Sequence, residues 1–236
     1  VQLALGGNDV RAARMHLDAM APDNDVERRA RDVLSARTLL AEGRADQALV
    51  VARAAAERWP GDEDPLIAAA DALLALGRTA AALDQLDGDP VLWPPERAAV
   101  AACIALAVHG PGAAAARLVR SNRPGEHPLG RLMAAALPDV ASEAAGRAAV
   151  ADVATLPPVL VAPLAQALGR AGRHDLAGAL RLNAAGVALR RGDDRLAIQH
   201  RRAARQHLRA RAGALAALSD ALTARDLPSL LRHLFP

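Results

Sequence analysis

The residues with the clearest capacity for chemistry are arginines near the C-terminus. Arg202, Arg205 and Arg209 recur at intervals of three and four residues, a spacing that places them on one face of a helix. Arg191 and Arg195 lie one to two helical turns earlier and extend this basic stripe. Guanidinium groups in such a row can bind phosphate or an acidic partner.

A solvated arginine face explains the same stripe. All 29 basic residues are arginine, and together with abundant Ala, Gly and Pro this usage is expected of a GC-rich bacterial genome. The chain has two Trp and one Phe, and none of them lies near the stripe, so aromatic platforms for stacking single-stranded bases are missing. We therefore expect another protein or peptide as the partner, and keep nucleic acid at the basic stripe as an alternative.

Patterns for catalysis and metal binding are weak. His200 and His207 could share a helical face, but a metal site needs three or four ligands and no further ligand stands at a suitable spacing. The acidic runs 62–64 and 193–194 precede expected helices, where carboxylates cap the N-terminus. The chain lacks lysine and a nucleophilic serine motif. We predict no cofactor, no metal and no catalysis. The alternative is an all-α enzyme with a site built from Asp and His, in which Asp71 would be needed for turnover.

Composition predicts that helices position these residues. Alanine dominates, and β-branched and aromatic residues are few, which favours helix over strand. Residues 1–169 hold 16 Arg against 21 acidic residues, whereas residues 170–236 hold 13 against 5. The positive charge is therefore concentrated at the C-terminal end.

Apolar runs bear on whether the chain enters a membrane, whereas the single cysteine does not fix the compartment. No apolar run approaches the roughly 20 residues that span a bilayer, and no basic-then-apolar signal segment opens the chain. The single Cys103 excludes an internal disulfide framework and is expected in the core. We expect a soluble protein without membrane insertion, cytoplasmic rather than periplasmic.

A repeat of 34 residues organises the first half of the chain. Gly43 and Gly77 stand 34 residues apart, and each is followed five residues later by an alanine, Ala48 or Ala82. A repeated unit of this length is a helix pair that must stack on its neighbours to bury its apolar face, so we predict an all-α solenoid. The helices predicted from apolar periodicity span 25–40, 45–58, 66–76, 79–86, 95–108 and 112–121. Pro65 is expected to open the third of these helices.

This stretch resembles the tetratricopeptide repeat family. Units of this family place small residues where the two helices cross and glycine at the turn between them. The further matching residues are Ala36, Ala55, Pro60 and Ala70. The resemblance implies antiparallel helix pairs whose first helices line a concave groove that holds a partner segment.

The same resemblance implies which residues line that groove. An apolar lining with a few charges would suit an amphipathic helix or an extended segment, with Arg37 and Asp71 selecting its charge. The implied groove residues are Val33, Arg37, Leu40, Asp64, Ile67, Asp71, Leu74, Arg97, Val100 and Ile104.

Regularity is lost along the chain. Residues 1–125 are predicted to hold tetratricopeptide-like repeats, about three helix pairs after a truncated first one that ends near Gly7. Residues 126–236 are predicted to hold degenerate helical repeats with an irregular middle and a basic C-terminal part. Because the chain opens on what looks like the end of a helix, we expect it to be part of a larger protein or assembly.

The helices predicted in the second half of the chain are irregular in length and spacing. We predict two helices within 126–156, a restart of the pattern near residue 156, and capping helices at 214–223 and 227–234. Gly172 and Gly192 are only 20 residues apart, so one helix either serves two units or is simply long.

Two functions remain open from the sequence. The first is a non-catalytic protein–protein interaction scaffold that binds a partner segment in the groove. The alternative is a helical sensor or regulatory arm of a transcriptional regulator or signalling ATPase, whose basic stripe contacts nucleic acid.

Overall fold

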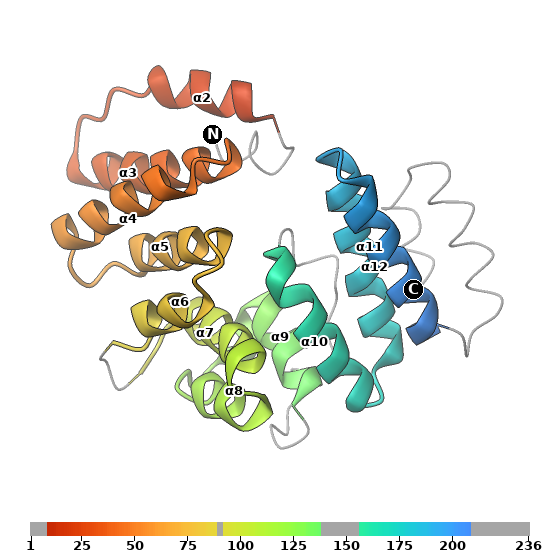
Figure 1. Cartoon of the computed structure of the whole chain (residues 1–236). Coiled ribbons are helices and arrows are strands. Elements are labelled where there is room, and N and C mark those ends of the chain that lie inside the picture. The colour runs from red at the N-terminus through yellow and green to blue at the C-terminus, as the bar shows by residue number, and fades with distance from the viewer. Residues whose placement is uncertain (1–8, 89–91, 138–155, 209–236) are drawn as a thin grey trace. The chain divides into compact units, whose positions relative to one another are not determined.

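The chain is helical throughout the part that the structure describes. The computed structural model describes residues 9–88, 92–137 and 156–208 (Figure 1). Within these ranges it contains helices and no strand. The elements are α2 (Val10–Asp18), α3 (Asp25–Ala41), α4 (Ala45–Arg58), α5 (Glu63–Ala75), α6 (Thr79–Leu86), α7 (Pro95–Val108), α8 (Pro111–Leu118), the 3-10 helix η1 (Pro124–Glu126), α9 (Pro128–Ala136), α10 (Pro158–Arg170), α11 (His174–Arg190) and α12 (Asp194–Leu208).

Two compact units make up the chain, Val1–Arg97 and Ala98–Pro236, here named unit 1 and unit 2. Helix α7 crosses the border, so its first residues belong to unit 1 and the rest to unit 2. The division expected after residue 125 concerns the end of the regular repeats and stays a prediction.

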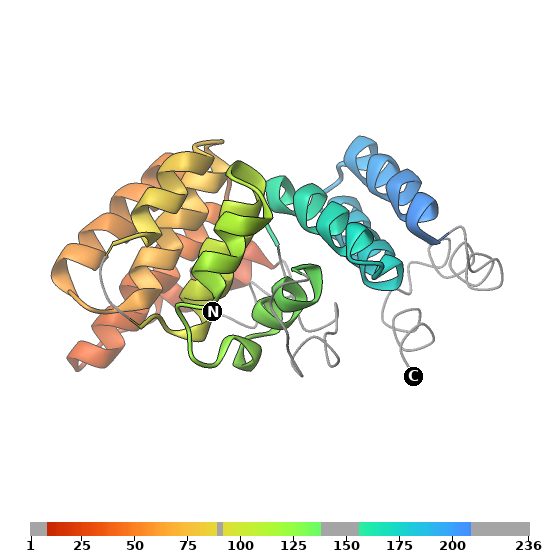
Figure 2. The same ribbon diagram turned by 90° about the horizontal axis from the view of Figure 1, so that it is seen from below.

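Unit 1 is a stack of helix pairs. Helix α3 packs against α4, α5 packs against α6, and both α3 and α4 pack on α5, while α2 packs on α3. Figures 1 and 2 show α3 to α6 side by side as successive layers. Packing of each pair on its neighbour in sequence confirms the predicted all-α solenoid class.

Glycine turns join the two helices of each pair. Gly43 and Gly77 have φ angles of +77° and +72°, in the left-handed region that glycine adopts without steric cost. After Gly43, the amide of Arg44 donates to the carbonyl of Leu39 at 2.9 Å, and the corresponding bond follows Gly77. Both turns are Schellman motifs. The 34-residue spacing therefore marks the same turn in two successive pairs.

Small side chains let the helices of unit 1 approach closely. The alanines at the predicted crossings are fully or almost fully buried, so no larger side chain fits between the two backbones. These alanines are Ala36, Ala48, Ala55, Ala70 and Ala82, all at most 2% exposed.

Side-chain caps explain where two helices of unit 1 begin. Asn24 accepts the Glu27 amide at 2.9 Å ahead of α3, and the Glu27 carboxylate accepts the Asp23 amide at 2.8 Å in return. Asp62 accepts the Asp64 amide at 3.3 Å ahead of α5. Helix α5 thus begins two residues before Pro65, the residue from which the sequence predicted its start.

In unit 2, α11 packs along both of its neighbours. Gly172 and Gly192 precede and follow this helix with φ angles of +76°, and each turn repeats the hydrogen bonding seen after Gly43. Helix α11 has 17 residues and packs against α10 on one side and α12 on the other. The 20-residue spacing is therefore the length of one long helix that two pairs share. Helix α10 also packs on α9, and α9 in turn packs against η1.

Several sequence predictions lie outside the described residues. These are Gly7 as the end of an earlier repeat, the helices at 214–223 and 227–234, and most of the second helix expected within 126–156. The first helix of that segment is α9. None of the helices in the described ranges is long and apolar enough to cross a lipid bilayer.

Candidate functional site

Three of the groove residues expected in unit 1 are buried. Val33 of α3 is 5% exposed, and Ile67 and Leu74 of α5 are each 4% exposed. They pack in the core of the helix stack, contrary to the prediction that they line an open groove. Helix α5 is apolar on almost every face, and such a helix is surrounded by protein.

Arg97 is also buried, at 3% exposure. Its guanidinium donates to the Leu86 carbonyl at 2.6 Å, to the Gly88 carbonyl at 2.8 Å and to the Glu63 carboxylate at 3.0 Å. The same group lies 4.8 Å from the centre of the Trp93 ring, within cation–π range. Arg97 therefore joins the start of α5 to the end of α6, rather than forming a surface that a partner contacts as the sequence predicted.

The other predicted groove residues of unit 1 remain partly open to solvent. Arg37, Leu40 and Asp71 are half-buried and Asp64 is exposed. Arg37 Nη2 lies 3.6 Å from Asp64 Oδ1, a contact that joins α3 to α5. The surface that a partner can reach is thus narrower and more polar than the predicted groove.

A carboxylate cluster dominates this surface. The pKa of Asp71 is raised from 3.8 to about 6, because burial raises it more than the positive charge of Arg37 lowers it, and the nearby negative charge of Glu96 adds to the rise. Asp64, Asp71 and Glu96 outnumber the single Arg37. We name these four residues the acidic face of unit 1.

Two predicted groove residues fall in unit 2. Val100 is half-buried, and Ile104 is fully buried on the same helix, α7. Cys103 is also fully buried, and burial raises the pKa of its thiol to about 12, so it remains a neutral core side chain.

The described part of the basic stripe faces solvent. Arg191, Arg195, Arg202 and Arg205 are all exposed, and Arg209 lies outside the described residues. Within the described ranges, none of these four arginines forms an ion pair with a carboxylate. They remain available to an anionic partner.

The two histidines of α12 are not brought into one site. His200 is buried at 4% exposure beside Arg181, whereas the half-buried His207 lies with its ring centre 6.1 Å from that of His174. No group of three or more possible metal ligands occurs among the described residues. Asp193 accepts the amide of Leu196 at 2.9 Å, which confirms that it caps α12.

Sequence reasoning missed two features. Glu96 belongs to the acidic face, and its position in the first turn of α7 gave no indication of the distant Asp71. A cavity in unit 2, lined by residues of α10, α11 and α12, was also missed because the helix register there was not fixed by the repeat.

The comparisons with known proteins bear on the helix pairs of unit 1. Residues 39–106 match the family model described as the tetratricopeptide repeat. The match runs from the end of α3 into α7 and so includes the two glycine turns and the α5–α6 pair. Neither the curated proteins nor the solved structures gave a match.

Proposed function

We propose, on the premise that residues 39–106 are tetratricopeptide repeats, that this chain is a non-catalytic scaffold whose acidic face binds a basic segment of a partner protein. Such repeats generally mediate protein–protein interactions. The observation that carries the proposal is the acidic face itself, where three carboxylates accompany one arginine.

Charge favours a basic partner. Arg37 contacts Asp64 and its positive charge also acts on Asp71, so a single cation is shared on a face that holds three carboxylates. The Asp71 carboxylate is half-buried, so its ionised form at neutral pH is poorly solvated. A lysine or arginine of a partner placed beside it would recover part of that lost solvation.

The residues next to the acidic face favour an amphipathic partner segment. Leu40 is half-buried one turn beyond Arg37 on α3 and offers apolar area next to the charges. A segment with basic and apolar side chains on the same face would match this combination. The buried Val33, Ile67 and Leu74 hold α3 and α5 in place beneath it.

Charge reversal tests the proposal. The purified chain and the variant Asp64→Lys with Glu96→Lys are used to capture proteins from the source organism, at low and at high salt. The control variant Asp46→Lys with Asp84→Lys reverses two exposed charges on α4 and α6, the second helices.

Only one pattern agrees with the proposal. The same protein should be captured by the unmodified chain and by the control variant, lost by the acidic-face variant, and released as salt rises. Circular dichroism should report equal helix content for all three chains. Equal capture by both variants, or equal loss from both, contradicts a role for this face.

A second candidate function rests on the exposed arginines of the basic stripe, of which Arg195, Arg202 and Arg205 lie on α12 and Arg191 follows the end of α11. Four guanidinium groups without carboxylate partners in the described residues support contact with a nucleic-acid backbone, as in a regulatory arm. The scaffold proposal ranks first because the repeats that match a family lie in residues 39–106, away from this stripe in the sequence.

A further inference from the structure

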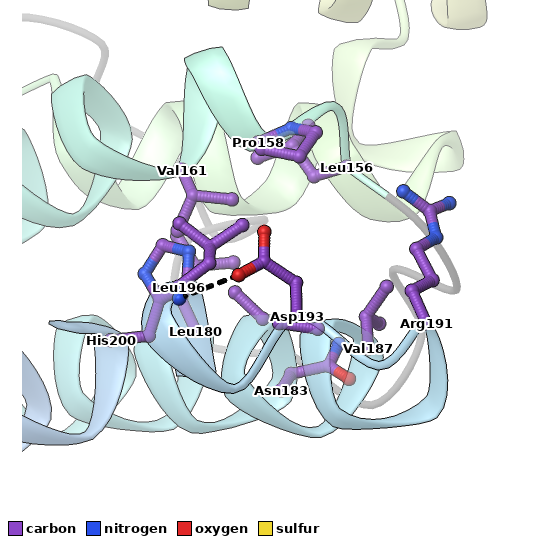
Figure 3. A pocket seen from close by; sticks show the side chains of 12 residues that line it. Leu156, Pro158, Val161, Leu180, Asn183, Val187, Arg191, Asp193, Leu196 and His200 are labelled. Carbon is purple, nitrogen blue, oxygen red and sulfur yellow. Dashed lines mark hydrogen bonds between the residues drawn. The ribbon is translucent and has the colours of Figure 1, made fainter. Parts of the chain in front are cut away.

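A cavity of about 350 Å³ lies among the three last described helices of unit 2 (Figure 3). This volume is in the range of small-molecule sites. Most of the lining is apolar and comes from Leu156, Val161, Leu180, Val187 and Leu196. The cavity therefore suits a ligand with a hydrocarbon body.

His200 is the deeply buried polar residue of this lining. Its Nδ1 lies 3.3 Å from Nη1 of Arg181. A guanidinium group has hydrogen-bond donors and no acceptor, so Nδ1 must be the acceptor in this contact. Burial and the positive charge of Arg181 both lower the pKa of His200, which keeps the ring neutral. The single ring proton of His200 is thereby fixed on Nε2.

This arrangement leaves a donor without an acceptor. Nε2 of His200 is buried and has no hydrogen-bond partner among the described residues. A buried donor that lacks an acceptor is destabilising, and a ligand oxygen would remove that penalty. Arg181 thus determines what His200 can bind: an acceptor atom and not a second donor.

The charge beside His200 points to an anion. Arg181 is half-buried, burial lowers its pKa, and its Nε also lacks a hydrogen-bond partner in the described part of the chain. No carboxylate of the described residues forms an ion pair with it. A partly desolvated cation without a counter-ion favours a negatively charged ligand group over a neutral carbonyl or hydroxyl.

Arg181 contacts His200 but does not itself line the cavity, and the charged residues of the lining are Arg191 and Asp193. Both are exposed, and Figure 3 shows Arg191 at the opposite end of the cavity from His200, with Asp193 between them. One oxygen of Asp193 accepts the Leu196 amide. Because Arg191 and Asp193 have opposite charges on the same stretch of chain, they offset each other and leave Arg181 as the uncompensated charge.

We propose that this cavity binds a small apolar carboxylate. One carboxylate oxygen accepts the Nε2 proton of His200, and the hydrocarbon chain lies against Val161, Leu180 and Val187. The site is separate from the acidic face of unit 1, and neither proposal depends on the other.

Binding of hexanoate to the full chain tests the proposal. Long-range ¹H–¹⁵N spectra of the histidine rings give the His200 tautomer, with the His200→Gln variant identifying its signals. The free protein should show the Nε2-protonated tautomer, and hexanoate should shift the Nε2 resonance to saturation. 1-Hexanol, which has the same hydrocarbon chain and no charge, should bind about ten-fold or more weakly, as expected for loss of a charge-assisted hydrogen bond.

A cavity-filling variant locates the site without changing His200. Ala184→Met places a larger side chain into the lining, whereas Ala203→Met on α12 changes a residue outside it. Hexanoate binding should be lost in the first variant and retained in the second. The proposal is overturned by an Nδ1-protonated His200, by hexanol binding as tightly as hexanoate, by no saturable binding, or by equal binding in the two variants.

Discussion

Arg97 Nη1 lies 3.0 Å from Glu63 Oε1, and these two residues stand 34 positions apart, one repeat length along the chain. The ion pair therefore joins equivalent positions of two successive first helices, α5 and α7. Arg97 also satisfies the carbonyls of Leu86 and Gly88 beyond the end of α6. A single buried side chain thus fixes how one repeat follows the next.

Removing this arginine should destabilise unit 1. Arg97→Ala leaves two backbone carbonyls and the Glu63 carboxylate without their donor, and we expect a loss of about 3 kcal/mol in the free energy of unfolding. Urea unfolding followed by circular dichroism measures it. The control Arg28→Ala breaks an exposed i,i+3 ion pair with Asp25 and should change stability by less than about 0.5 kcal/mol. Similar values for the two variants would refute the structural role of Arg97.

Asp71 should make stability depend on pH. Its pKa is raised from 3.8 to about 6 in the folded chain, so the folded state holds the proton more tightly than the unfolded state. The stabilising contribution of the protonated form is complete below about pH 3.8 and is lost as pH rises through about 6. Asp71→Asn should therefore be more stable than the unmodified chain at pH 8, by on the order of 2 to 3 kcal/mol.

The comparison is made by urea unfolding at pH 4, 6 and 8. The stability difference between Asp71→Asn and the unmodified chain should shrink to near zero at the lowest pH. Asp84→Asn, which changes an exposed carboxylate on α6, should stay within about 0.5 kcal/mol throughout. A difference that does not vary with pH would show that burial does not hold the proton on Asp71.

Gly130 should tolerate no side chain. A Cβ at this position of α9 would lie 1.9 Å from the backbone carbonyl oxygen of Pro124 in η1. Gly130→Ala must displace η1, and we expect a loss of at least about 2 kcal/mol despite the better helix propensity of alanine. Gly112→Ala in α8 meets nothing within 4 Å and should be neutral or stabilising. Thermal unfolding of the two variants gives the comparison, and a stabilised Gly130→Ala chain would contradict the close contact of η1 with α9.

The basic stripe gives a prediction for the second candidate function. Arg202→Gln with Arg205→Gln removes two exposed charges from α12 and should reduce the salt dependence of binding to duplex DNA by a slope of about 2. Fluorescence anisotropy over a salt series measures the slope. An unchanged slope would exclude the stripe as a phosphate-binding surface and leave a solvated arginine face.

The sequence predicted much of unit 1 because its signals are local. Glycine and proline mark the turns, and the predicted bounds of α4, α6 and α7 agree with the structure. The sequence also predicted which alanines lie at the helix crossings, because only small side chains fit where two backbones pack closely. Pro65 misled the prediction of α5 because proline is accepted within the first turn of a helix.

The candidate sites depend on contacts that the sequence does not encode locally. Ile67 and Leu74 belong to a helix that is apolar on almost every face, a pattern that indicates burial. The prediction that they line an open groove followed the family resemblance instead of this pattern. Glu96 raises the pKa of Asp71 only because the fold brings the start of α7 near α5. Arg181 meets His200 across the turn at Gly192, and this contact depends on the register of α11 against α12.

Photo-crosslinking from the acidic face tests the central proposal most directly. Benzoylphenylalanine replaces Leu40, beside Arg37, in one chain and Val50, which is 69% exposed on α4, in the other. The Leu40 chain should crosslink one partner through a peptide rich in Lys or Arg, and the Val50 chain should not. A partner captured equally from Val50, or an acidic crosslinked peptide at Leu40, would contradict binding of a basic segment at this face.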